Sequence, residues 1–194
     1  MARLRRYKLE DRAATYHVSA RVVARKGEYP LADPVHSEHL LELIEHYTSI
    51  YFCSPSSFCI LGNHYHLVVH FEEPREVDRA ELRHRADALY PSAAGQKEVD
   101  EWLEVDWQRL NARLFDLSEL MRNIQGVYAA WYNRLNDRRG AFWSRKVPGS
   151  LFGAFTRSRH FIPTQQLSAE LRIGFSQPIC VVEPASHRVA AASH

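Results

Sequence analysis

The segment from His64 to Phe71 constrains the fold more than any other part of the sequence, because two kinds of residue alternate along it. One set is Tyr65, Leu67, Val69 and Phe71, and the other is His64, His66, Val68 and His70. Successive side chains of a strand point to opposite faces, so the pattern predicts a strand with one packed face and one histidine face. Gly62-Asn63 before it predicts a tight turn, with Phe58 to Leu61 as the other strand of a hairpin.

Further elements follow from the same kind of pattern. We expect a half-buried strand from Thr15 to Val23, a helix from Pro34 to Phe52, a turn at Pro55, a helix from Leu117 to Asn136 capped by Asp116 or Ser118, and a fourth strand from Ala141 to Val147. This order of strands and helices predicts an α+β fold, a ferredoxin-like (RRM-like) antiparallel sheet with helices on one face and the histidine pair on a central strand.

The first and third predicted strands are expected to be neighbours at the centre of the sheet. Their polar faces then meet on the side that the helices leave uncovered. This arrangement places one polar set, His17, Ser19 and Arg21, beside the other, His64, His66 and His70. His17 and His70 are expected to support the site rather than to be direct ligands.

The chain divides by composition into a domain over residues 1–147 and a poorly patterned tail over 148–194, which frays from Gln177 onward. Within the domain, residues 72–111 are rich in Glu, Arg, Asp and Ala and predict a charged helical insert with two short helices.

Overall composition indicates a soluble globular protein: 45% of the 194 residues are hydrophobic and 25% are charged, with a formal net charge of +2. Three cysteines without a CxxC pair indicate neither a disulfide framework nor a thiolate zinc site, so we expect a reducing cytoplasm. No apolar run approaches the roughly 20 residues that span a bilayer, so no membrane partner is expected.

Two histidines at positions i and i+2 of a strand have Cβ atoms roughly 6 to 7 Å apart, and from there two imidazoles can converge on one metal ion. His64 and His66 are therefore candidate metal ligands. An isolated HxH pair is more often a pair of ordinary sheet histidines, so the spacing alone is weak evidence.

The surrounding residues add a resemblance. Residues 62–69 have the sequence GNHYHLVV, which resembles the histidine segment of the HUH family. The chain looks like a one-tyrosine HUH transposase of the insertion-sequence or REP-associated type. The resemblance continues through Tyr128 to Arg134 and Arg138 to Arg145, which look like the late helix and following strand of that family, and it covers roughly residues 10 to 147.

This resemblance implies metal-dependent cleavage and strand transfer on single-stranded or hairpin DNA, by a tyrosine that attacks the phosphorus, in a homodimer. A divalent ion on the two histidines would polarise the scissile phosphate. Magnesium or manganese is expected, with zinc as a further option, because imidazole suits manganese and zinc while phosphate oxygens can complete a magnesium shell.

The chain departs from the family at the nucleophile, since no tyrosine follows Tyr132. Tyr128 and Tyr132 are candidate substitutes, although both lie on or beside the apolar stripe of their helix. The resemblance then implies an active or a degenerate transposase. The alternatives are a noncatalytic nucleic-acid-binding module of the same fold and a metal-binding structural protein.

Basic residues interleaved with aromatic rings are the candidate DNA contacts, because they combine charge for phosphates with surfaces for stacked bases. This set comprises Arg21, Arg134, Arg138, Arg139, Trp143, Arg145 and Lys146. Such charges are also common on solvated surfaces, and such rings are common in cores.

Overall fold

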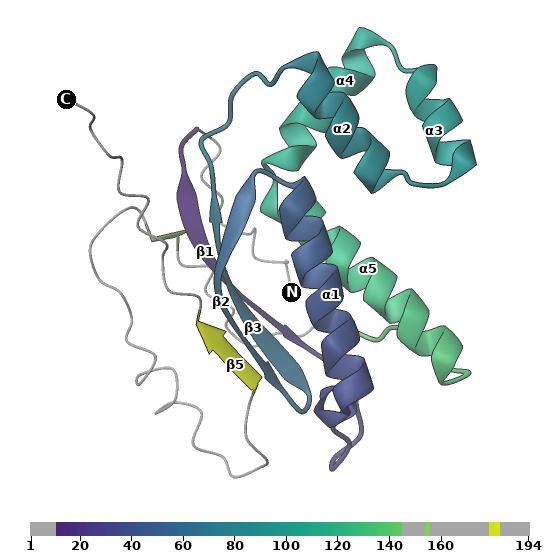
Figure 1. The fold of residues 1–194 in the computed structure, drawn as a ribbon. Helices are drawn as coiled ribbons and strands as arrows, with labels where there is room; N and C mark the ends of the chain where they lie inside the picture. Colours follow the sequence, from purple (N-terminus) through teal and green to yellow (C-terminus); the bar gives the residue numbers. More distant parts are fainter. Residues whose placement is uncertain (1–10, 145–153, 156–178, 183–194) are drawn as a thin grey trace, which may run out of the picture.

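The computed structural model describes residues 11–144, 154–155 and 179–182 (Figure 1). Its elements are β1 (Ala14–Arg21), the 3-10 helix η1 (Pro30–Ala32), α1 (Pro34–Ile50), β2 (Cys53–Leu61), β3 (His64–Phe71), α2 (Arg79–Leu89), α3 (Ala93–Asp100), α4 (Glu104–Leu114), α5 (Leu117–Leu135), β4 (Ala154–Phe155) and β5 (Ile179–Val182). No helix in these described ranges is both long and apolar enough to cross a membrane.

A three-stranded antiparallel sheet in the order β1-β3-β2 forms the centre of the fold, and the short strands β4 and β5 extend it at its two edges. Helices α1 and α5 cover one face of this sheet (Figure 1). The α+β fold and the central place of β3 are therefore confirmed. The ferredoxin-like description stays a prediction, because the strand that follows α5 is present only as a two-residue pairing.

The core lies between the sheet and these two helices. Tyr65, Leu67 and Val69 of β3 are 0% exposed, as are Leu40 of α1 and Leu120 of α5. Burying apolar surface of this kind contributes about 25 cal/mol per Å², so the period-two pattern of β3 fixes which of its faces meets the helices. The histidine face is consequently the face turned away from the core.

The hairpin between β2 and β3 turns at Gly62 and Asn63, as predicted. A Cβ at position 62 would lie 2.9 Å from the Cβ of Tyr29, so the close approach of the Tyr29 side chain requires glycine there. The Gly62 carbonyl accepts a hydrogen bond from the Leu31 amide at 2.9 Å, and the Asn63 carbonyl accepts one from the Val22 amide at 2.8 Å. These bonds connect the turn to η1 and to the residue that follows β1.

The prediction of a turn at Pro55 is wrong, because β2 begins at Cys53 and runs through this proline. The register against β3 shifts between Pro55 and Ser57, which marks a β-bulge. Proline has no N–H to donate to a ladder and is tolerated at bulges and edges. Pro55 also lies beyond the pairing of β2 with β5, which covers Ser57 to Ile60.

The predicted fourth strand from Ala141 to Val147 is not observed in its described part. Trp143 makes only an isolated bridge to Val22, and residues 145–147 lie outside the described residues. Along the edge of β1, β4 pairs instead with Thr15 and Tyr16. The start of α5 is as predicted, since the Asp116 carboxylate accepts from the Glu119 amide at 3.3 Å and also from the Ser118 amide.

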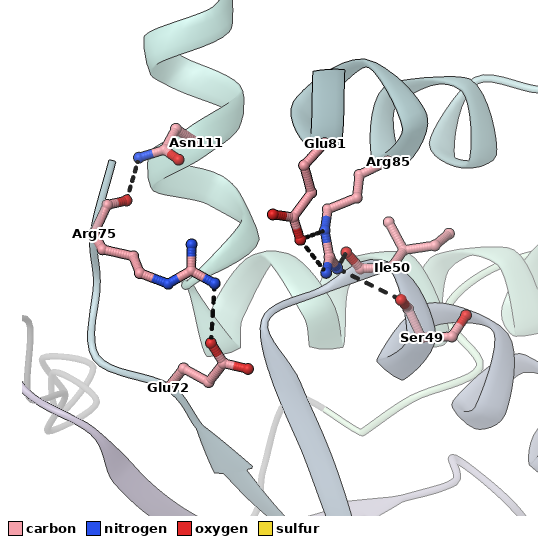
Figure 2. A network of polar contacts seen from close by, with 7 residues as sticks. All are labelled: Ser49, Ile50, Glu72, Arg75, Glu81, Arg85 and Asn111. Carbon is pink, nitrogen blue, oxygen red and sulfur yellow. Dashed lines mark hydrogen bonds and ion pairs between the residues drawn. The ribbon is translucent and has the colours of Figure 1, made fainter. Parts of the chain in front are cut away.

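The charged insert forms three helices, α2, α3 and α4, rather than two. Its apolar residues, Leu82, Ala86, Val99, Trp107 and Leu110, are buried despite the charged composition. Arg85 of α2 joins the insert to the rest of the fold, because its guanidinium donates to the carbonyls of Ser49 and Ile50 at the end of α1 (Figure 2). The third helix was not predicted, because the few apolar residues of α4 are separated by many charged ones in the sequence.

In the tail, Ile179 to Val182 forms β5 against β2, so the prediction that the chain frays from Gln177 onward is wrong for these four residues. They are apolar or β-branched, and pairing with β2 supplies partners for their backbone groups. Apart from β4 and β5, residues 148–194 lie outside the described residues.

Candidate metal and phosphate site

The histidine face is formed by alternate residues of the two neighbouring strands β1 and β3. Arg21 lies opposite His64 and Ser19 opposite His66 in the antiparallel register, and Thr15 lies opposite His70. The histidines are half-buried. The prediction that the polar faces of β1 and β3 meet is therefore confirmed. Arg21 is the residue of β1 that lies directly beside His64.

The rings of His64 and His66 lie close together, with centroids 5.3 Å apart and ring planes at 79°. His64 Nδ1 is 2.8 Å from the Oδ1 of Asn63. An amide oxygen only accepts, so His64 donates from Nδ1, and in the neutral ring the lone pair is then on Nε2.

His66 makes a different contact, across the sheet. Its Nδ1 is 2.9 Å from the Nε2 of His17, and the two rings are nearly parallel, with planes 24° apart and centroids 5.1 Å apart. His70 is engaged separately, since its Nδ1 is 3.0 Å from the Thr15 hydroxyl.

Burial lowers the pKa of all three clustered histidines. The pKa of His66 falls to about 4, first because burial disfavours the charged ring and then because His17 and His64 add positive charge beside it. Burial also lowers the pKa of His17, and burial together with the Arg21 charge lowers that of His64. Neutral imidazole is the form that binds metals, so the electrostatics of the site suit a ligand role at neutral pH.

The described residues contain no group of three or more His, Cys, Asp and Glu side chains arranged to hold a metal ion. Of the described residues, His64 and His66 would supply at most two ring nitrogens to such an ion, and oxygen atoms from another source would have to complete its coordination shell. His17 does not act as a third ligand through Nε2 in this arrangement, because that atom faces His66 Nδ1.

Tyr128 and Tyr132 lie on α5, among the core side chains on the opposite side of the sheet. Their exposed fractions are 0% and 8%. The Tyr128 hydroxyl donates to the His36 carbonyl at 3.1 Å, and burial raises the pKa of this phenol. The sheet separates both hydroxyls from the histidine face, so the structure does not bring these candidate nucleophiles together with the candidate metal ligands.

The candidate DNA contacts come from two parts of the chain, β1 and the end of α5 with the residues after it. Arg21 is exposed beside the histidines on β1. Arg134 lies in the last turn of α5, and Arg138 and Arg139 follow that helix. Arg138 donates to the Val23 carbonyl at 2.8 Å. Arg145 and Lys146 lie outside the described residues.

Trp143 is half-buried on the helix side of the sheet. Its Nε1 donates to the Gln125 carbonyl at 2.8 Å, and its ring packs edge-on against Tyr65, with centroids 5.5 Å apart. In this position the ring contributes to packing rather than to the histidine face.

Two features of this region were not predicted. Asn63 is more than a turn residue, because its side chain orients His64, and its place directly before the histidine is the only sequence signal of that role. A cleft also lies near the Gly62-Asn63 turn, and its lining includes Arg25, Tyr29, Asp33, His36 and Arg138. The spacing of these residues in the sequence does not predict it.

Comparison with known proteins adds little to this geometry. No family model matches the chain, and no curated protein matches it. Among solved structures, a REP-associated tyrosine transposase bound to a REP hairpin is similar, with 10% sequence identity, a TM-score of 0.31, and coverage of 81% of this chain and 100% of that chain. A TM-score of this size does not establish a shared fold.

Proposed function

We propose that this chain is a DNA-binding protein of the transposase type, which holds a divalent metal ion on His64 and His66 against a phosphate of single-stranded or hairpin DNA. The observation that carries this proposal is the pair of adjacent half-buried imidazoles on the central strand, with ring centroids 5.3 Å apart and pKa values lowered by burial. The HUH resemblance of residues 62–69 agrees with it.

Manganese, magnesium and zinc are the proposed ions. When bound, such an ion supplies a Lewis acid that polarises a phosphate oxygen. Arg21 supports the same role from the protein side, because it is exposed and lies opposite His64 in the sheet. A guanidinium presents a planar set of donors that matches phosphate geometry, so Arg21 would bind the phosphodiester beside the pair.

The resemblance also implies DNA cleavage and strand transfer, for which a tyrosine oxygen must reach the phosphorus. The burial of Tyr128 and Tyr132 beneath the other face of the sheet favours a second candidate, a noncatalytic DNA-binding module of the same fold. In that candidate the histidines and Arg21 bind the phosphate, and the chain does not cut it.

The test measures the affinity of the protein for a fluorescently labelled hairpin with a single-stranded flank, with manganese and with a chelator. We expect manganese to strengthen binding by roughly tenfold, which corresponds to about 1.4 kcal/mol. A His64→Ala/His66→Ala variant should lose this effect. His84→Ala is the matched control, since His84 is an exposed histidine of α2 and should keep it.

An equal manganese effect in the double variant and in the wild type would refute the proposed site. The same mixtures, run on a denaturing gel, distinguish the two candidates. A covalent protein–DNA adduct would establish cleavage, and peptide mapping would identify the tyrosine. Metal-dependent binding without an adduct would favour the noncatalytic module.

A further inference from the structure

One contact in the histidine cluster joins residues 49 positions apart in the chain. His17 lies on β1 and His66 on β3, and the 2.9 Å separation of His17 Nε2 from His66 Nδ1 crosses the gap between these strands. In the register, His17 lies opposite Val68, so it meets His66 along the diagonal of the ladder. Both residues project from the histidine face.

The contact contains one hydrogen-bonding proton, which belongs to one ring or the other when both rings are neutral. If His17 donates it from Nε2, the Nδ1 lone pair of His66 is used to accept, and the proton of His66 is on its Nε2. His66 then has no lone pair left for a metal. If His66 donates from Nδ1, its Nε2 carries a free lone pair.

We propose that His17 is a positioning residue that accepts a hydrogen bond from His66 Nδ1 and thereby holds His66 in the tautomer whose Nε2 binds a metal ion. This inference rests on the proposed metal site at His64 and His66. It assigns to His17 the effect that Asn63 has on His64, where an amide oxygen accepts from Nδ1 at 2.8 Å. Both candidate ligands, His64 and His66, then carry the proton on Nδ1 and have a free lone pair on Nε2.

This arrangement has the general form of a metal site in which the second nitrogen of each histidine ligand is held by a neighbouring acceptor. Loss of such an acceptor typically weakens metal affinity by 10- to 100-fold. His17 differs from the amide or carboxylate partners usual in this role, because an imidazole accepts only when its own proton is on the other nitrogen. The geometry therefore requires His17 to carry its proton on Nδ1.

The first test reads the tautomers directly in the metal-free wild-type protein, by long-range ¹H–¹⁵N correlation spectra of the histidine rings. We expect the Nδ1–H form for His64 and His66, although free imidazole side chains prefer Nε2–H. In His17→Ala, His66 should return to the Nε2–H form while His64 keeps its own. An Nε2–H signal for His66 in the wild type would overturn the proposal without any variant having to fold.

The second test measures manganese affinity by calorimetry, without DNA. His17→Ala should bind roughly 10- to 100-fold more weakly than the wild type. His17→Gln places an amide oxygen near the position of Nε2 and should retain affinity to within about threefold, because it still accepts a hydrogen bond. Circular dichroism of each metal-free variant confirms that the fold is retained.

The matched control is Thr15→Ala. It removes the 3.0 Å contact of Thr15 with His70, on the same strand and the same face, and should leave manganese affinity unchanged. Equal weakening in the alanine and glutamine variants would overturn the proposal in favour of a direct ligand or a packing role. Unchanged affinity in both would overturn it while the metal site stands. Absence of manganese binding in the wild type, both alone and in the presence of the hairpin DNA, would overturn the proposed function as well.

Discussion

Replacement of Arg85 by alanine should detach the helical insert from the end of α1. The Arg85 guanidinium donates to the Ile50 carbonyl and, at 3.5 Å, to the Ser49 carbonyl (Figure 2). The last carbonyls of a helix have no partner within the helix, and a cation there also interacts favourably with the helix dipole. The guanidinium also lies 3.8 Å from the centre of the Phe52 ring, and the side chain is only 18% exposed.

The expected loss of stability follows from these contacts. A hydrogen bond from a charged donor contributes about 1.5–3 kcal/mol, and a partly desolvated cation–π contact contributes about 0.5–2 kcal/mol. The ion pair with Glu81 at 2.9 Å, one helical turn away, adds only about 0.3–0.5 kcal/mol. We therefore expect Arg85→Ala to lower the free energy of unfolding by about 3 kcal/mol.

The assay is urea unfolding followed by circular dichroism and by tryptophan fluorescence, since Trp102 and Trp107 report on the insert. Arg85→Lys keeps the charge without the planar set of donors, so it should lose about half as much. Arg109→Ala is the control, because that side chain is 71% exposed and its ion pair within the described part of the chain is with Asp106 of the same helix. A loss of less than about 1 kcal/mol in Arg85→Ala would refute the assigned role.

Four further predictions concern other parts of the molecule. Gly126→Ala should raise the free energy of unfolding by about 0.5–1 kcal/mol, because Gly126 lies within α5 with open space at its Cβ position. Urea unfolding measures the change, and a destabilised variant would contradict the prediction. Tyr128→Phe should cost about 1 kcal/mol through the lost bond to His36 and should leave any DNA adduct intact, whereas loss of the adduct would restore Tyr128 as a nucleophile. Burial raises the pKa of the half-buried Cys53 thiol to about 12, so at pH 8 its alkylation should be at least about a hundredfold slower than in unfolded protein. Peptide mapping measures the labelling, and rapid labelling would refute the raised pKa. Arg21→Ala should reduce the dependence of DNA affinity on salt by about one phosphate contact in anisotropy titrations, and an unchanged slope would exclude a phosphate role.

Much of the sheet could be predicted from the sequence, because its signals are local. The bounds of β3 were predicted correctly from the alternation of His64 to Phe71, and the start of α5 from Asp116. Side-chain alternation and helix capping depend on residues a few positions apart, so a single stretch of sequence contains them. The insert was predicted less well, since the few apolar residues of α4 lie among many charged ones and are buried in a fold where α4 packs against α2 and α5, which are distant from it in the sequence or differently patterned.

The histidine pair itself was determined by the sequence alone, since the period of a strand places His64 and His66 on one face wherever that strand lies. Asn63, the residue before His64, holds that ring locally, whereas the tertiary structure decided which group holds the ring of His66. The contact of His17 with His66 depends on the register between β1 and β3, and a slip of one residue would turn His17 toward the core. The contact of Arg85 with the end of α1 and the pairing of β5 with β2 were likewise decided by the tertiary structure. Each joins segments that are far apart in the chain, so no local sequence pattern predicts it.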